Sequence, residues 1–293
     1  MGMSFLLNDI SIYLIQGVYM NKLYNKLYGA KYLNNIEKNA SELKAKYLKM
    51  SKFYDNNEEF PFENKGIIHE TQIKTHFDEK THTFMIAFES SRPNRVHKKL
   101  PVAFDWIINF TALPSKVLSY PIYINDTKFC TEGYGIHSGY ALSFLSVIDY
   151  LSKKIDECLA TNVIKEFNVY GWSYGGAMAS LLHLWLKAKY SKKPTITFTI
   201  GAPMVWFHPI INPFEFFRIK RLKSRIEGLY MFQNANDIVP KAPFKILGYR
   251  HLTPNIVLEK PFNLIKIFKP TVYHLKTRYD ELITNYFDRM LVK

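Results

Sequence analysis

The sequence has few cysteines, no long hydrophobic run and few acidic residues, and each shortage excludes a class of protein. Its two cysteines, Cys130 and Cys158, form no Cys-x-x-Cys pair, so we expect neither a disulfide scaffold nor a zinc module. No uninterrupted apolar run approaches the roughly 18 residues that span a bilayer. At 47% hydrophobic over 293 residues, the chain is instead globular and long enough to bury a sizeable core.

The shortage of acidic residues gives a strongly basic chain. Lys and Arg number 39 against 25 Asp and Glu, a net charge of +14. Such a charge suits nucleic acid or a membrane surface. The basic residues are scattered along the whole chain, however, which favours a general composition bias over a functional field. A nucleic-acid binder would gather them on one face, so we expect no nucleic-acid partner.

The amino terminus carries no clear targeting signal. The apolar stretch from residue 5 to residue 20 is interrupted by Asn8, Asp9 and Gln16, and no basic residue precedes it, unlike a secretory signal. Position six is Leu6, where myristoylation requires Ser or Thr. We therefore expect a cytoplasmic protein, with contact at lipid surfaces as a peripheral alternative.

Hydrophobic periodicity divides the chain into two parts. Residues 1–60 are expected to be an N-terminal helical segment that packs on the core, and residues 61–293 a single α/β domain. The polar stretch 55–65 is predicted to be a loop. Strands are predicted at 71–77, 83–88, 167–170, 195–200 and 229–233, the first two as a hairpin, and helices at 140–159 and 177–190. Alternating strands and helices favour a mostly parallel central sheet flanked by helices.

A serine lies between a predicted strand and a predicted helix. The pattern is Gly171-x-Ser173-x-Gly175, in which small neighbours allow a sharp, strained turn. Such a turn exposes the serine hydroxyl at the edge of the sheet and directs the following backbone N–H toward a substrate. The alternative is a plain glycine-rich connection without catalytic meaning.

An acid and a base are expected to follow such a nucleophile in the order Ser, Asp, His. Asp237 comes just after the strand 229–233, at the carboxyl edge where active sites gather in open α/β sheets. Its alternative role is turn formation. Two histidines lie beyond it, His251 and His274, and the order alone leaves both open.

These blocks, in this order, resemble the class 3 lipases, the fungal triacylglycerol lipase type of α/β-hydrolase, over roughly residues 67 to 280. The resemblance rests on residues 84–91, Asp105-Trp106-Ile107-Ile108, residues 136–140, residues 171–177, residues 198–203, residues 234–240, Gly248-Tyr249-Arg250-His251 and His274. It implies an α/β-hydrolase fold and the triad Ser173, Asp237 and His274. It also implies backbone N–H donors at Ser91 and Tyr174 for an oxyanion hole.

The resemblance leaves the other histidines in structural roles. His251 falls on a position that is usually structural, His137 is expected to pack near the serine turn, and His183 is expected to be a satisfied core residue.

Two departures from the family pattern concern the oxyanion loop and the serine turn. The loop reads Phe88-Glu89-Ser90-Ser91 where Phe-Arg-Gly followed by Thr or Ser is usual, and Trp172 stands where histidine is usual. Glu89 brings negative charge near a developing oxyanion, and Ser90 replaces a glycine whose backbone freedom could matter. The triad is unaffected, but the rate of the reaction is open.

Two basic segments are candidates for contact with lipid. Residues 91–105 occupy the place of the family's lid, and their lysines and arginines would favour opening at an anionic surface. Residues 218–225 follow several phenylalanines and could lie at an interface. In both cases the alternative is an ordinary solvated segment.

The sequence thus predicts a serine hydrolase that cleaves carboxylic esters of lipids through an acyl-enzyme. The alternatives are a phospholipase A1 or lysophospholipase, and a catalytically weak lipase-fold protein that binds lipid or protein. No cofactor is implied, and no His/Cys/Asp cluster has metal-ligand spacing.

Overall fold

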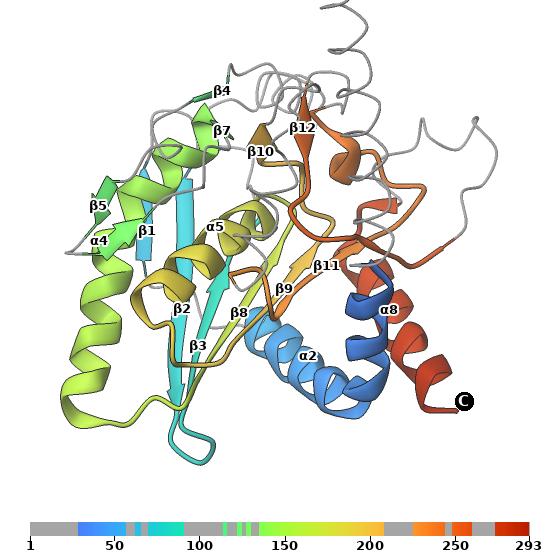
Figure 1. Cartoon of the computed structure of the whole chain (residues 1–293), viewed down its shortest axis with the longest axis horizontal. Coiled ribbons are helices and arrows are strands. Elements are labelled where there is room, and N and C mark those ends of the chain that lie inside the picture. The colour runs from blue at the N-terminus through green and yellow to red at the C-terminus, as the bar shows by residue number, and fades with distance from the viewer. Residues whose placement is uncertain are drawn as a thin grey trace, which may run out of the picture.

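A seven-stranded sheet forms the centre of the molecule (Figure 1). The computed structural model describes residues 29–56, 62–65, 70–90, 114–115, 122–124, 127–129, 135–207, 225–243, 248–259 and 273–292. The strands, in spatial order, are β1 (Phe62–Lys65), β2 (Glu70–Asp78), β3 (Thr83–Phe88), β8 (Glu166–Trp172), β9 (Thr195–Ile200), β11 (Leu229–Gln233) and β13 (Ile256–Val257). From β3 to β13 all neighbours are parallel, which confirms the predicted sheet.

The two antiparallel strands lie at one edge. β2 and β3 form the predicted hairpin, whose turn is held by Asp78 Oδ1 accepting the Lys80 N–H at 2.9 Å. β1 lies inside the stretch that was predicted to be a loop, so that prediction is wrong at residues 62–65. Phe62 pairs with Ile73 of β2. An edge strand needs only one partner, and backbone pairing here overrides weak strand propensity.

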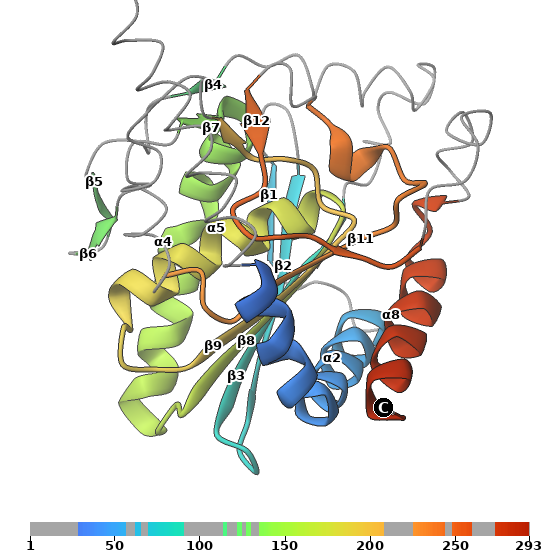
Figure 2. The same cartoon turned by 45° about the vertical axis from the view of Figure 1, so that its right-hand side comes forward.

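Helices cover both faces of the sheet (Figures 1 and 2). The helices are α2 (Ala40–Asp55), α4 (Ser138–Thr161), α5 (Tyr174–Lys189) and α8 (Lys276–Leu291). Alternate residues of β3 show the division: Phe84 and Ile86 pack with α4 and α5, whereas Met85 packs with α2 and α8. Both faces of these parallel strands are therefore buried, as their apolar sequences require.

Helix α5 lies directly against the sheet and is buried almost all round. Every residue from Tyr174 to Leu186 is buried, which explains why its sequence is apolar on all sides rather than on one stripe. α4 shows the opposite pattern, with one apolar face on the core and charged residues outward, as its periodicity predicted.

The amino-terminal and carboxyl-terminal helices of the described chain lie side by side. α2 contacts α8 as well as β8 and β3. Residues 29–38 are also helical. The rest of the predicted N-terminal segment 1–60, namely residues 1–28 and 57–60, lies outside the described residues. α8 was not predicted. No helix in the described parts of the chain is long and apolar enough to cross a membrane.

Short strands outside the main sheet complete the fold. The sequence did not predict the small antiparallel sheet β12-β10-β7-β4, which consists of β12 (Tyr249–Arg250), β10 (Trp206–Phe207), β7 (Gly135–His137) and β4 (Pro114–Ser115). β5 (Ile122–Ile124) and β6 (Thr127–Phe129) pair as a hairpin, and η2 (Val239–Lys241) is a short 3-10 turn.

Candidate active site

The turn between β8 and α5 holds Ser173 in an unusual backbone conformation. Its φ is 57° and its ψ is −125°, a backbone conformation that residues other than glycine rarely adopt. The neighbouring glycines are required by space. A Cβ on Gly171 would lie 2.0 Å from the Gly175 carbonyl oxygen, and one on Gly175 would lie 2.3 Å from the Phe88 carbonyl oxygen. The strained turn that the Gly-x-Ser-x-Gly pattern predicts is therefore present.

Ser173 heads a buried chain of hydrogen bonds. Its Oγ lies 2.8 Å from His274 Nε2, and His274 Nδ1 lies 2.6 Å from Asp237 Oδ2. Asp237 follows β11, and its second oxygen accepts the Val239 N–H at 2.9 Å, which fixes the carboxylate. Asp237 is fully buried, and the exposed fractions of Ser173 and His274 are 8% and 6%. The structure thus brings together the three residues that the sequence selected.

A tyrosine from α8 adds a further contact to the carboxylate. The Tyr279 hydroxyl donates to Asp237 Oδ2 at 2.7 Å and accepts the Asn234 N–H at 3.0 Å. Burial, with the Asp237 charge adding to it, raises the pKa of Tyr279 well above its usual value, so the phenol stays a neutral donor. Sequence reasoning gave Tyr279 no role. Its only signal was its position shortly after His274.

The imidazole of His274 is packed on its face as well as bonded at both nitrogens. The Trp172 ring stacks on it with centroids 5.3 Å apart and planes at 28°. Gly201, at φ 56°, leaves the room that the imidazole needs, because a Cβ there would lie 3.1 Å from His274 Cε1. Trp172, which departs from the family pattern, therefore lies against the histidine rather than away from it.

Of the two residues proposed for an oxyanion hole, the structure describes Tyr174 but not Ser91. Tyr174 is the first residue of α5, where backbone N–H groups have no carbonyl partner within the helix. Its hydroxyl lies 2.7 Å from Thr71 Oγ1, which anchors the side chain away from the N–H. Ser91 lies outside the described residues, as do residues 92–105 and most of 218–225.

The remaining histidines make structural contacts. His251 Nε2 lies 2.8 Å from the Pro240 carbonyl oxygen. His183 is fully buried, with Nδ1 2.8 Å from Thr197 Oγ1, and burial lowers its pKa to about 3. His137 is buried against the ring of Tyr140. His274, not His251, is the histidine that reaches Ser173. The described residues also contain no group of three or more His, Cys, Asp or Glu that could hold a metal ion.

A mostly parallel sheet that presents a serine at a strand-to-helix turn, bonded to histidine and aspartate, defines the α/β-hydrolase class. The family model described as lipase (class 3) matches residues 104–247. Over these residues, just under half of its length, the chain is similar to the class 3 lipases.

The chain is also similar to a curated protein and to solved structures. The chain is 24% identical over 155 residues to a secreted mono- and diacylglycerol lipase 1 of Fusarium solani, an alignment that covers 53% of this chain and only 40% of the relative. The Lip2 lipase of Yarrowia lipolytica has a similar structure, with a TM-score of 0.55, 18% identity, and 75% of this chain and 78% of that chain covered. A triacylglycerol lipase with a serine protease triad as its catalytic centre has a TM-score of 0.51 and 21% identity, with 68% and 66% covered. At these identities the two structures show the fold alone.

Proposed function

We propose that this protein hydrolyses carboxylic esters of lipids, with Ser173 as nucleophile, His274 as general base and Asp237 as the acid that orients it. The observation that carries the proposal is the unbroken hydrogen-bond chain from the Ser173 hydroxyl through His274 to Asp237. It begins at a strained turn next to the first N–H of α5. A serine merely filling a glycine-rich turn needs neither the histidine nor the buried carboxylate.

The first half of the reaction forms an acyl-enzyme. Ser173 Oγ attacks the ester carbonyl while its proton moves to His274 Nε2. Asp237 accepts the Nδ1–H, which holds the imidazole in the required tautomer and stabilises the imidazolium. When the tetrahedral intermediate collapses, the C–O bond to the alcohol breaks and His274 gives its proton to the leaving oxygen. The acyl group remains on Ser173.

The second half returns the enzyme to its starting state. His274 takes a proton from water, and the hydroxide attacks the acyl carbonyl. The bond to Ser173 breaks, Ser173 Oγ recovers its proton from His274, and the carboxylic acid leaves. In both halves the negative oxygen needs backbone donors, for which we propose the N–H groups of Tyr174 and Ser91. One such donor typically lowers the activation barrier by about 2.7–4 kcal/mol.

An acylglycerol is the first proposed substrate, because the curated relative is a mono- and diacylglycerol lipase. A phospholipase A1 or lysophospholipase would use the same residues with a pocket that tolerates phosphate. The proposed setting is a cytoplasmic protein that contacts anionic lipid surfaces through its basic segments. Glu89 and Ser90, in place of the family's Arg and Gly, favour the remaining candidate, a lipid- or protein-binding protein with little turnover.

The test is labelling with a fluorophosphonate followed by turnover of p-nitrophenyl esters. We expect the wild-type protein to label and turn over, and Ser173→Ala to do neither. Ser180→Ala is the matched control. Ser180 is a buried serine of α5, the helix that follows Ser173, and its hydroxyl donates to the Ala177 carbonyl at 2.7 Å. It should label normally. A folded wild type that neither labels nor turns over, with detergent present, would favour the binding protein.

A further inference from the structure

The end of β3 lies directly against the serine turn. A Cβ on Gly175 would meet the carbonyl oxygens of Phe88 and Glu89, at 2.3 and 2.8 Å. On its other side this segment is held by β2, since the Glu89 N–H donates to the Gln72 carbonyl at 3.1 Å. The backbone at Glu89 and Ser90 therefore borders the space in which an ester carbonyl would be attacked by Ser173. Its exact position affects any dipole it presents to the developing oxyanion.

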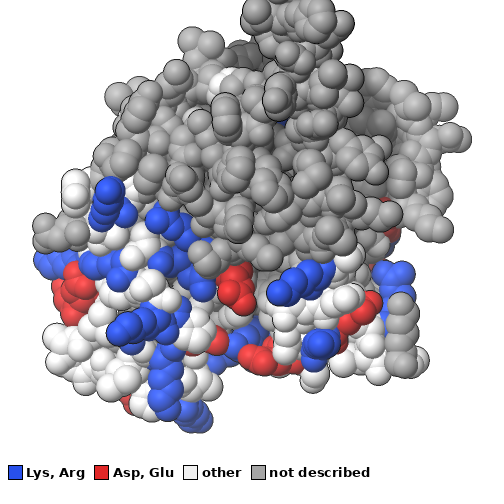
Figure 3. Space-filling view, in the orientation of Figure 1, with Lys and Arg blue, Asp and Glu red and all other residues white. Residues whose placement is uncertain are grey.

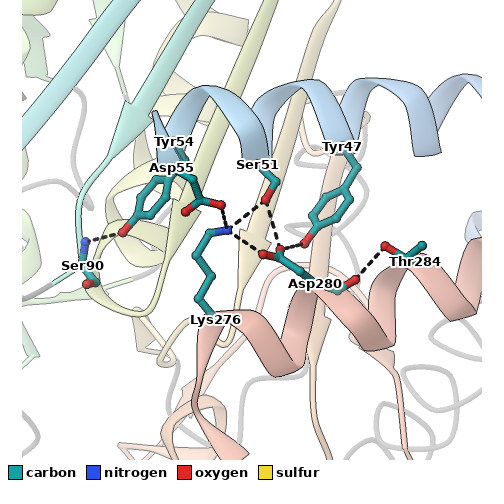
Figure 4. A network of polar contacts seen from close by, with 8 residues as sticks. All are labelled: Tyr47, Ser51, Tyr54, Asp55, Ser90, Lys276, Asp280 and Thr284. Carbon is teal, nitrogen blue, oxygen red and sulfur yellow. Dashed lines mark hydrogen bonds and ion pairs between the residues drawn. The ribbon is translucent and has the colours of Figure 1, made fainter. Parts of the chain in front are cut away.

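A side chain from the amino-terminal helix fixes the next peptide group. Tyr54 belongs to the last turn of α2, and its hydroxyl accepts the Ser90 backbone N–H at 3.2 Å (Figure 4). Its ring lies beside that of Tyr170 in β8, with centroids 5.2 Å apart. Burial is the main cause that raises the pKa of Tyr54, so the hydroxyl stays protonated at neutral pH. Since β2 holds the peptide before Ser90, Tyr54 adds a second, separate attachment point.

The Tyr54 ring is itself held by a polar network between α2 and α8 (Figure 4). Lys276 Nζ lies 5.4 Å from the centre of the Tyr54 ring, within cation–π range. The same ammonium group bonds Asp280 at 2.6 Å, Asp55 at 2.6 Å and Ser51 at 2.9 Å. The Lys276 side chain is only 11% exposed, although Asp55 is 53% exposed. The bonds to Asp280 and Ser51 are therefore shielded from water better than surface ion pairs.

The network also connects the two halves of the site. Lys276 is two residues beyond His274, at the start of α8, and Asp280 accepts a further hydrogen bond from Tyr47 of α2. One cluster of side chains therefore braces the helix that follows the histidine and the tyrosine that bonds Ser90. A displacement of α2 would move both, which couples the base to the loop after β3.

We infer that Tyr54 is a positioning residue for ester hydrolysis: its hydroxyl holds the Ser90 N–H and so fixes the backbone beside Ser173 for transition-state stabilisation. This rests on the function proposed above. The tyrosine supplies a hold from another element on the peptide between Glu89 and Ser90. Fixed dipoles stabilise a transition state better than mobile ones because they need no reorganisation during the reaction.

The experiment compares Tyr54→Phe with wild type in the full-length protein. In Tyr54→Phe, kcat for ester hydrolysis should fall about tenfold while KM stays within about twofold, because substrate binding does not use this contact. Affinity for an alkyl boronic acid, which forms a tetrahedral adduct with a serine, should weaken by the same factor as kcat. The matched control is Tyr32→Phe, which removes a buried tyrosine hydroxyl that donates to the Leu229 carbonyl at 2.9 Å and lies outside the network between α2 and α8. It should lower the unfolding temperature and leave both kcat and boronate affinity within about twofold of wild type.

A second variant tests the contact from its other side. Ser90→Pro removes the N–H, and in a double-mutant cycle the Tyr54→Phe and Ser90→Pro losses in kcat should be clearly less than multiplicative. Equal kcat losses in Tyr32→Phe and Tyr54→Phe, fully multiplicative losses in the double-mutant cycle, or unchanged boronate affinity of Tyr54→Phe would each overturn the inference. Failure of the underlying function is recognised separately, as absent labelling in the wild type itself.

Discussion

At the scale of single residues, Trp172 is a departure from the family pattern that directly contacts a proposed catalytic residue. It immediately precedes the proposed nucleophile and stacks on the proposed base. In the proposed mechanism His274 carries a positive charge in the transition state. An indole face attracts a cation by roughly 0.5–1 kcal/mol when partly exposed. The tryptophan is therefore expected to favour the charged imidazole, in addition to restricting its rotation.

This predicts the behaviour of two substitutions. Trp172→Leu should lower kcat about two- to fivefold with little change in KM, since it removes the ring from the imidazole face. Trp172→Phe, which keeps an aromatic face, should retain most of the activity. Steady-state turnover of a p-nitrophenyl ester measures both. A Leu variant with normal kcat and a raised KM would place Trp172 in substrate binding instead.

At the scale of elements, the close approach of β3 to α5 depends on glycine at position 175. Gly175→Ala would bring a methyl group to 2.3 Å from the Phe88 carbonyl oxygen, which is backbone and cannot swing away. We expect a loss of about 3 kcal/mol in the free energy of unfolding and loss of fluorophosphonate labelling, because the strand end must move from the turn.

The matched control for that prediction is Gly29→Ala. A Cβ on Gly29 would meet only Pro254 Cγ, at 3.9 Å, so the change should be neutral or slightly stabilising. Urea unfolding of both variants gives the comparison. Equal stability of the two would mean that the turn tolerates separation from β3.

The elements also show what the sequence could and could not predict. β9 and β11 were predicted with their observed bounds, and β8 and α5 to within three residues. Each of these elements has a continuous apolar pattern, and clear turn residues separate it from the next. β10, β12 and β13 are two residues long, and their pairing comes from partners remote in the chain. α8 went unpredicted, and with it the contact from Tyr279 to Asp237. Ser173 and Asp237 could be selected from their motif and order, and the family resemblance selected His274 over His251, whereas Tyr54 belongs to no motif.

At the scale of the whole molecule, positive and negative side chains are mixed on the described surface that faces the viewer in Figure 3. In Figure 3 the lysines and arginines of the described part lie among aspartates and glutamates. Several are paired, including Lys46 with Glu166 at 2.5 Å and Lys154 with Glu157 at 2.9 Å. This mixing agrees with a composition bias as the source of the +14 net charge.

Global stability should depend on pH through a residue that takes no part in catalysis. The pKa of His183 is about 3 in the folded protein because it is buried, against about 6.5 in an unfolded chain. Between these values only the unfolded state binds the proton, so stability falls as pH is lowered from about 6.5 toward 3. The slope contributed by this one group is on the order of 1 kcal/mol per pH unit.

Urea unfolding at pH 7 and pH 5 measures this effect. His183→Gln keeps a polar group near Thr197 but cannot titrate, so the variant should lose less stability than wild type between the two pH values. Identical losses would assign the acid sensitivity to other groups.

The order of the site residues along the chain has a consequence in time. Ser173 and His274 are 101 residues apart, which at ribosomal speeds of about 5–20 residues per second separates their synthesis by roughly 5–20 seconds. During this interval a growing chain contains the proposed nucleophile but not its base. Translation would thus withhold the proposed hydrolytic activity from nearby lipids until all strands of the central sheet have been made.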